Sequence, residues 1–159
     1  MIIIGYPGIG KTSLARYWNR CIDLESSNFI IDGKKMPNWH ITYCKIADDL
    51  SHQGFRVFVS SHSEVQEEFK KYNKEDIVIC APSIKLKTEW VNKLKERYED
   101  TKLEKDLRAY ENSKNNYSAN ITQLMASPFD FAEINKIDYW LEDIIDDYIG
   151  NCWKNQKFY

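Results

Sequence analysis

The sequence predicts an α/β domain built on a parallel β-sheet. Short runs rich in β-branched residues alternate with helical patterns along the chain, which is typical of a parallel sheet with helices on both faces. Near the N-terminus an apolar strand runs through a glycine-rich turn into a helical pattern. The chain has 159 residues, enough for one domain with a buried core and too few for two ordinary domains. We therefore expect residues 1–159 to form a single domain.

Strands and helices are assigned from hydrophobic periodicity and from the residues that end each pattern. The expected strands are residues 2–5, 21–24, 55–60, 76–81 and 129–134. The expected helices are residues 11–19, 39–50, 65–72, 86–98, 103–124 and 137–148, the last of them stopped by Gly150. Residues 26–52 read as a loop and one helix, and residues 151–159 form a tail without an assigned structure.

Composition limits the partners of the protein. The net charge is −2 with both signs interspersed, so we expect neither a nucleic-acid nor a membrane surface as a main partner. The apolar start, Met1 to Ile4, is too short for a signal peptide or a membrane span, and we expect a soluble cytoplasmic protein. Four widely spaced cysteines form no CxxC pair, so we expect reduced, buried thiols at Cys21, Cys44, Cys80 and Cys152.

The glycine-rich loop, residues 5–12, carries the strongest functional signal. Its sequence, Gly-Tyr-Pro-Gly-Ile-Gly-Lys-Thr, fits G-x-x-x-x-G-K-[ST] at every fixed position. Such a loop can direct several backbone N–H groups at a polyphosphate, and the helix N-terminus adds partial positive charge. Lys11 is expected to reach the β- and γ-phosphates of ATP, and Thr12 to bind Mg²⁺. The expected nucleotide-binding residues are Gly5, Pro7, Gly8, Ile9, Gly10, Lys11, Thr12 and Ser13.

Carboxylates at the end of the second predicted strand suggest the rest of the site. Asp23 and Glu25 share one side of an extended segment whose carboxyl end should lie near the glycine-rich loop. We expect Asp23 to help hold Mg²⁺ and Glu25 to contact an acceptor hydroxyl. The third strand ends in Ser60-Ser61-His62 without an acid, which disfavours a motor-type ATPase. His62 either contacts acceptor or phosphate, or begins the next helix.

From residue 77 onward the sequence resembles the nucleoside monophosphate kinase family, most of all guanylate kinases. The resemblance rests on residues 77–83 (Ile-Val-Ile-Cys-Ala-Pro-Ser) and 90–97 (Trp-Val-Asn-Lys-Leu-Lys-Glu-Arg). It continues at Arg108, Phe129-Asp130, Ile134-Asn135, Leu141 and Ile144-Ile145. It implies a P-loop NTPase fold with strand order 2-3-1-4-5, and a helical lid within residues 84–125.

The resemblance also implies roles for individual residues. Arg97 and Arg108 correspond to lid cations that neutralise charge on the transferring phosphoryl group, with Lys93 as a further candidate. Asn135 follows the last strand, where the adenine of the family rests. The expected catalytic residues are thus Lys11, Asp23, Arg97 and Arg108. The same residues of the lid could instead form a solvated charged helix face, because many acids accompany them.

Residues 26–52 depart from the family, whose acceptor-binding insertion is rich in β-structure. Guanylate specificity therefore does not transfer, and candidate acceptor contacts are Ser26, Ser27, Asn28, Phe29, Lys34, Lys35, Trp39 and Tyr43. Phe29 or Trp39 could stack on a base, although each is as readily a core residue. The Asp23-x-Glu25 pair also resembles the D-x-D of shikimate-type kinases, so a non-nucleotide acceptor stays open.

Three functions remain in competition at this point. A kinase that uses Mg-ATP to phosphorylate a nucleoside monophosphate or nucleoside leads, as a monomer or homodimer. A small-metabolite kinase and a regulatory nucleotide-binding protein with slow hydrolysis are the alternatives. Residues 135–138 (Asn-Lys-Ile-Asp) match the guanine-reading N-K-x-D of GTPases, but the required D-x-x-G after the third strand is missing.

Overall fold

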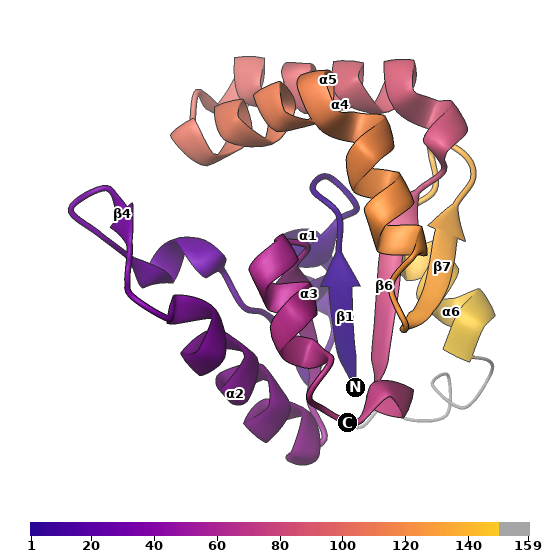
Figure 1. Cartoon of the computed structure of the whole chain (residues 1–159). Coiled ribbons are helices and arrows are strands. Elements are labelled where there is room, and N and C mark those ends of the chain that lie inside the picture. Colours follow the sequence, from indigo (N-terminus) through magenta and orange to yellow (C-terminus); the bar gives the residue numbers. More distant parts are fainter. Residues whose placement is uncertain (150–159) are drawn as a thin grey trace.

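A parallel five-stranded sheet forms the centre of the molecule. The computed structural model describes residues 1–149, apart from the side chains of Lys74 and residues 146–149. The strands lie in the order β2 (Cys21–Asp23), β5 (Arg56–Ser60), β1 (Ile2–Gly5), β6 (Ile77–Pro82) and β7 (Asp130–Ile134). The α/β class and the parallel sheet expected from the sequence are therefore confirmed (Figure 1).

Two short strands that the sequence analysis did not expect form a separate hairpin. They are β3 (Ile30–Ile31) and β4 (Lys34–Lys35), joined by Asp32 and Gly33 with φ of 49° and 75°. Positive φ at both turn residues is typical of a type I′ hairpin, so the reading of residues 26–52 as a loop and one helix was incomplete. Because β3 and β4 take two numbers, the sheet is not numbered 2-3-1-4-5. By residue range, the five expected strands nevertheless occupy those places.

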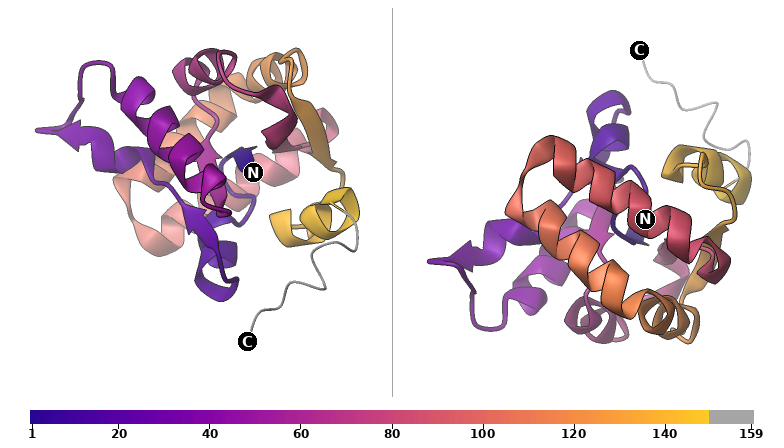
Figure 2. Two further views of the ribbon diagram at one scale, coloured as in Figure 1. Left: turned by 90° about the horizontal axis from the view of Figure 1, so that it is seen from below. Right: turned by 90° about the horizontal axis from the view of Figure 1, so that it is seen from above.

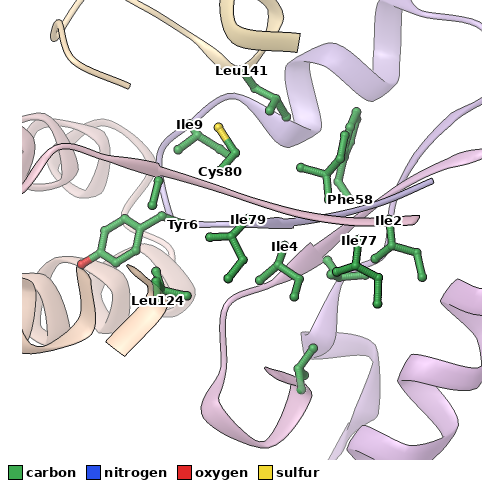
Figure 3. Close-up of a cluster of buried hydrophobic side chains, with 14 of the residues drawn as sticks. Ile2, Ile4, Tyr6, Ile9, Phe58, Ile77, Ile79, Cys80, Leu124 and Leu141 are labelled. Carbon is green, nitrogen blue, oxygen red and sulfur yellow. The ribbon is translucent and has the colours of Figure 1, made fainter. Parts of the chain in front are cut away.

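Helices cover both faces of the sheet. They are α1 (Lys11–Tyr17), α2 (Trp39–His52), α3 (Ser63–Phe69), α4 (Lys87–Thr101), α5 (Glu104–Met125) and α6 (Leu141–Ile149). Short 3₁₀ turns are found at Ser26–Phe29, Lys74–Asp76 and Ile84–Leu86. Figure 3 shows Leu141 and Cys80 on one side of the sheet, and Leu124 and Tyr6 on the other. Within the described residues, no helix has both the length and the apolar composition needed to cross a membrane.

The expected helix over residues 137–148 begins later than its periodicity suggested. The N–H of Trp140 donates to Oδ2 of Asp143 at 2.8 Å, which caps α6 and sets its start at Leu141. Ile137 and Trp140 lie before the helix and are 37% and 46% exposed. The side chain of Tyr148, the stop at Gly150, Cys152 and the tail lie outside the described residues. The other segments differ from expectation by a few residues at their ends.

Apolar side chains fill both sides of the central strands. Ile2, Ile3 and Ile4 of β1 are at most 2% exposed, as expected for a strand that is paired on both edges and covered on both faces. Cys21, Cys44 and Cys80 are buried and free, which confirms the expectation for the three cysteines that the structure describes.

Helices α4 and α5 form an antiparallel hairpin across the carboxyl ends of the strands (Figures 1 and 2). Trp90 and Leu94 of α4 are buried, as are Tyr117 and Ile121 of α5. The hydroxyl of Tyr117 donates to the carbonyl of Ser83 at 2.8 Å and ties α5 to the end of β6. The segment expected to act as a lid is thus helical, and a large part of it belongs to the core.

The hydroxyl of Tyr43 connects the ends of two neighbouring strands. It donates to the carbonyl of Leu24 at 2.6 Å and accepts from the N–H of Ser60 at 2.8 Å. Tyr43 is fully buried, and burial raises the pKa of its hydroxyl. Tyr43 of α2 therefore fixes the distance between the carboxyl ends of β2 and β5.

Replacing Tyr43 by Phe tests this connection. Tyr43→Phe leaves the half-buried carbonyl of Leu24 and N–H of Ser60 without their partner, so the free energy of unfolding should fall by about 1–3 kcal/mol. Tyr17→Phe is the matched control, because Tyr17 is 85% exposed and should change stability little. Urea denaturation of the three proteins measures the difference, and equal midpoints would contradict the structural role of this hydroxyl.

Candidate functional site

The glycine-rich loop leaves the end of β1 and enters α1 at Lys11. Gly8 and Gly10 have φ of 86° and 99°, a backbone conformation that side chains disfavour. Gly10 is also close to another part of the chain, since a Cβ at this position would lie 3.1 Å from Cε3 of Trp140. Glycine is therefore required at Gly10 by both conformation and space.

The side chain of Lys11 folds back over the start of the loop. Its Nζ donates to the carbonyl oxygens of Gly5 at 2.7 Å and Tyr6 at 3.2 Å. Burial lowers the pKa of Lys11, and the charge of Arg97 lowers it further, while Asp23 opposes the shift. A Cβ on Gly5 would lie 2.6 Å from Cδ of Lys11, so only glycine leaves room for this path. The ammonium group is thus held at the mouth of the loop, where an anion would be attracted.

Thr12 and Asp23 meet beside the loop. The hydroxyl of Thr12 donates to Oδ2 of Asp23 at 2.5 Å, so the end of β2 does lie near the loop as expected. Mg²⁺ is usually held by one or two protein oxygens together with water and phosphate oxygens, and this pair of oxygen donors fits that pattern. Among the described residues there is no group of three His, Cys, Asp or Glu side chains that could hold a metal by themselves.

Two tryptophans and a lysine connect helix α4 and the residue before α6 with the glycine-rich loop. Nε1 of Trp90 donates to the carbonyl of Pro7 at 3.0 Å. Nζ of Lys93 lies 4.3 Å from the ring centroid of Trp90 and 3.7 Å from that of Trp140. This Nζ is buried and has no hydrogen-bond partner among the described residues, and burial lowers its pKa. We call Trp90, Lys93 and Trp140 the cation clamp.

A cleft of about 280 Å³ opens next to the glycine-rich loop. One side is formed by the start of the loop and Lys11, and another by the segment that follows β5. Helix α5 supplies the remaining side. The side chains and loop residues that line it are Gly5, Tyr6, Pro7, Lys11, Ser60, Ser61, His62, Ser63, Gln66, Asn112, Asn120, Gln123 and Leu124.

The segment after β5 gives the cleft a row of polar groups. Oγ of Ser60 is buried and has no hydrogen-bond partner among the described residues. His62 occupies the N-cap position of α3 and also lines the cleft, so both readings of this residue are compatible with its position. Burial against neighbouring groups lowers the pKa of His62, and the charge of Lys35 adds to this effect. The imidazole is therefore neutral at pH 7.

The aromatic residues expected to contact an acceptor pack mostly on one another. The ring centroids of Trp39 and Tyr43 are 5.4 Å apart, and that of Phe29 lies 5.6 Å from Tyr43. Trp39 is 7% exposed and carries Nζ of Lys35 at 3.8 Å from its ring centroid. Trp39 and Tyr43 thus belong to the core in this structure, and Phe29 is half-buried. Ser26, with Oγ 3.4 Å from Nε2 of His62, is the member of this group nearest the cleft.

The two arginines expected in the lid are paired with carboxylates. Arg97 bonds to Asp106, which is 2% exposed and also accepts from Oγ1 of Thr101 at 2.6 Å. Arg108 pairs with Glu104 on the exposed face of α5 and acts electrostatically on Lys35, whereas Arg97 acts on Lys11. Arg97 therefore lies toward the loop and Arg108 toward the β3–β4 side.

Glu25 is engaged in an ion pair, and Asn135 is exposed. Oε1 of Glu25 lies 3.1 Å from Nζ of Lys105, so this carboxylate joins the end of β2 to the start of α5. Asn135 is exposed in the segment between β7 and α6. That segment approaches the glycine-rich loop through the N–H of Leu141, which donates to the carbonyl of Ile9 at 2.9 Å.

Sequence analysis missed the contribution of α5 to the cleft. Asn112, Asn120 and Gln123 line it, together with Gln66 of α3. A signal was present, because amides recur at positions 112, 116, 120 and 123, a spacing that places them on one helical face. The cation clamp was also missed, since Trp140 was placed on the buried face of a helix.

Substitution of Gly10 tests the constraint on the loop. Gly33→Ala is the matched control, because Gly33 has φ of 75° with no atom within 4 Å of an added Cβ. Gly33→Ala should lower the free energy of unfolding by about 1–2 kcal/mol through backbone strain alone. Gly10→Ala should lower it by ~1 kcal/mol more, because the Cβ also meets Trp140. Equal losses in denaturant titrations would contradict the close packing of Trp140 on the loop.

Comparison of the chain with models of protein families found no family that matches. Comparison with curated protein sequences found no match either.

Proposed function

We propose that the protein is a P-loop phosphotransferase that moves the γ-phosphoryl group of Mg-ATP to a small acceptor. One arrangement carries this proposal: the glycine-rich loop with Lys11 at its mouth and the Thr12–Asp23 pair at its side, all next to a polar cleft. A loop of this kind suits an anion, and the neighbouring cleft has space for a second molecule.

The loop would hold the triphosphate through its backbone N–H groups and the N-terminus of α1. Lys11 would exchange the carbonyl oxygens of Gly5 and Tyr6 for phosphate oxygens, which compensate its charge better. Thr12 and Asp23 would hold Mg²⁺, which neutralises negative charge on the phosphates when it is bound. We propose that the adenine of ATP rests against the exposed segment at Asn135.

The α4–α5 hairpin would supply further positive charge as phosphate transfers. We propose that Arg97, on the loop side of the hairpin, contributes most and that Arg108, which is farther from Lys11, contributes less. Lys93 is a second source of charge, because its buried ammonium lacks a hydrogen-bond acceptor. A phosphate oxygen near the clamp would supply that acceptor.

The position of the cleft favours group transfer over a purely regulatory role. Lys11 lines the cleft, so a hydroxyl bound there would lie beside the γ-phosphate that Lys11 contacts. The hairpin above would limit the access of water and so reduce wasteful hydrolysis. A nucleoside monophosphate or a nucleoside is the leading acceptor, and a small metabolite is the alternative. A regulatory protein with slow hydrolysis would need no such cleft.

Acceptor-dependent ADP formation tests the proposal. Mg-ATP is incubated with nucleoside monophosphates, nucleosides and small hydroxylated metabolites, and ADP is measured. One acceptor class should stimulate ADP formation, and Lys11→Ala should reduce the stimulated rate by about 100-fold or more, because a preorganised cation is lost. Tight ATP binding without stimulation by any acceptor would contradict a kinase and favour the regulatory alternative.

A substitution in the cation clamp distinguishes a functional from a structural role of Lys93. Lys93→Met retains an apolar stem between the two indole rings and removes a buried charge that lacks a hydrogen bond, so the free energy of unfolding should be unchanged or higher. The KM for ATP should rise about tenfold, because a charged phosphate contact is lost.

Lys95→Met is the matched control for this change. Lys95 is exposed on the same helix and pairs with Glu99 at 3.6 Å, so its loss should leave both quantities nearly unchanged. A marked loss of stability in Lys93→Met, with the KM for ATP unaltered, would assign Lys93 to structure alone.

A further inference from the structure

We infer that the acceptor is an uncharged nucleoside, and that the amide side chains of Asn112, Asn120, Gln123 and Gln66 form its binding wall. This inference rests on the proposed kinase function and specifies the substrate class of the same cleft. It is carried by the kinds of groups that line the cleft and by the pairing of the cations around it.

The cleft contains one positive charge. Of its lining residues only Lys11 is charged at pH 7, because the pKa of His62 is lowered and the other side chains are neutral. The ATP phosphates would compensate that charge. A second phosphate group, carried by an acceptor, would then enter a cleft without a cation of its own and would repel the donor phosphates.

Four cations outside the cleft are already engaged in ion pairs or hydrogen bonds, and a fifth, Lys93, is enclosed between Trp90 and Trp140. Arg97 is held by the buried Asp106, and Arg108 by Glu104. Lys105 pairs with Glu25 at 3.1 Å. Nζ of Lys35 donates to the carbonyl of Ser26 at 2.7 Å and lies over Trp39. Recruiting any of them for an acceptor phosphate would require an existing contact to break.

The amide wall offers the hydrogen-bonding pattern of nucleobase edges. Each amide side chain presents both a donor and an acceptor, which lets Asn and Gln pair with a base edge through two bonds. The side chain of Gln123 makes no hydrogen bond to another described residue, and that of Asn112 uses only its Oδ1, which accepts from Asn116 at 3.0 Å. These two residues therefore have unused bonding groups at the cleft.

The rest of the wall is held in place by the fold. Asn120 lies near the hydroxyl of Tyr6, which is 3.0 Å from Oγ of Ser113. Nε2 of Gln66 donates to the carbonyl of Ser61 at 3.0 Å, and Gln66 is 4% exposed. The wall thus joins α3 and α5 across the cleft at fixed positions. A volume of about 280 Å³ is near the lower end for ligand pockets and suits a compact acceptor.

The geometry places the reaction at the Lys11 end of the cleft. With the base on the amide wall, the sugar would extend toward Lys11, and one of its hydroxyl oxygens would attack the γ-phosphorus. The bond from that phosphorus to the bridging oxygen of ADP breaks as the new P–O bond forms. The hydroxyl proton passes to solvent or to a nearby basic side chain. The products are a nucleoside phosphate and ADP.

Calorimetry on the full chain tests the inference independently of turnover. The protein is saturated with Mg²⁺ and β,γ-imido-ATP and titrated with adenosine, guanosine, cytidine and thymidine, with their 5′-monophosphates, and with ribose. At least one nucleoside should bind at least tenfold more tightly than its own monophosphate and than ribose. Asn112→Ala and Gln123→Ala should each weaken that binding about tenfold, and Asn115→Ala, an exposed amide of α5 outside the cleft, should not.

ADP formation from Mg-ATP with the same compounds separates the two proposals. Nucleoside binding without ADP formation would support the amide wall and contradict the kinase. ADP formation with monophosphates as the better acceptors would support the kinase and overturn the uncharged acceptor. Binding of ribose as tight as that of every nucleoside would overturn recognition of the base. Binding that is equally reduced in Asn115→Ala would overturn the assignment of the wall.

Discussion

The burial of β1 between β5 and β6 is the constraint on which the candidate site depends. Because Ile2 to Ile4 are almost completely enclosed, the end of this strand cannot shift without opening the core. The glycine-rich loop therefore begins at a fixed position. Hydrogen bonds from Trp90 to the carbonyl of Pro7 and from Leu141 to that of Ile9 hold it at two further positions. A loop held at several points can present its N–H groups in one arrangement, which lowers the ordering cost of binding an anion.

Two buried lysine ammonium groups near this loop are compensated in different ways. Lys11 and Lys93 are both dehydrated, and each has a pKa lowered by burial. Lys11 is compensated by carbonyl oxygens and by Asp23 nearby, whereas Lys93 is stabilised by the faces of two indole rings. Burying two charges costs free energy, and the anionic ligand proposed above would compensate that cost.

The sequence was sufficient for those parts of the site that depend on local geometry. The loop followed from a spaced motif between a strand and a helix, and the approach of Asp23 followed from the rule that parallel strands end at one edge. The β3–β4 hairpin was overlooked, although Asp32-Gly33 is a turn signal that could have revealed it. Trp140 has helical spacing from the apolar residues of α6, yet the cap at Asp143 leaves it outside the helix and over Gly10.

The amide wall could not be derived from periodicity alone. Its position depends on how α5 docks, and that docking is set by long-range contacts such as the bond between Tyr117 and Ser83. The same contacts explain why much of the expected lid belongs to the core, and why its arginines are compensated by Asp106 and Glu104. Local sequence therefore predicts the glycine-rich loop better than the cleft beside it.

We expect the glycine-rich loop to bind a polyphosphate. Calorimetric titration of the protein with ATP, ADP and AMP in the presence of Mg²⁺ tests it most directly, because the three ligands share a base and differ in phosphate number. ATP and ADP should bind with similar affinity and AMP at least 100-fold more weakly, since the loop and Lys11 would contact phosphates that AMP lacks. Equal affinity for all three would contradict it, because the base would then supply the binding energy and the loop would not.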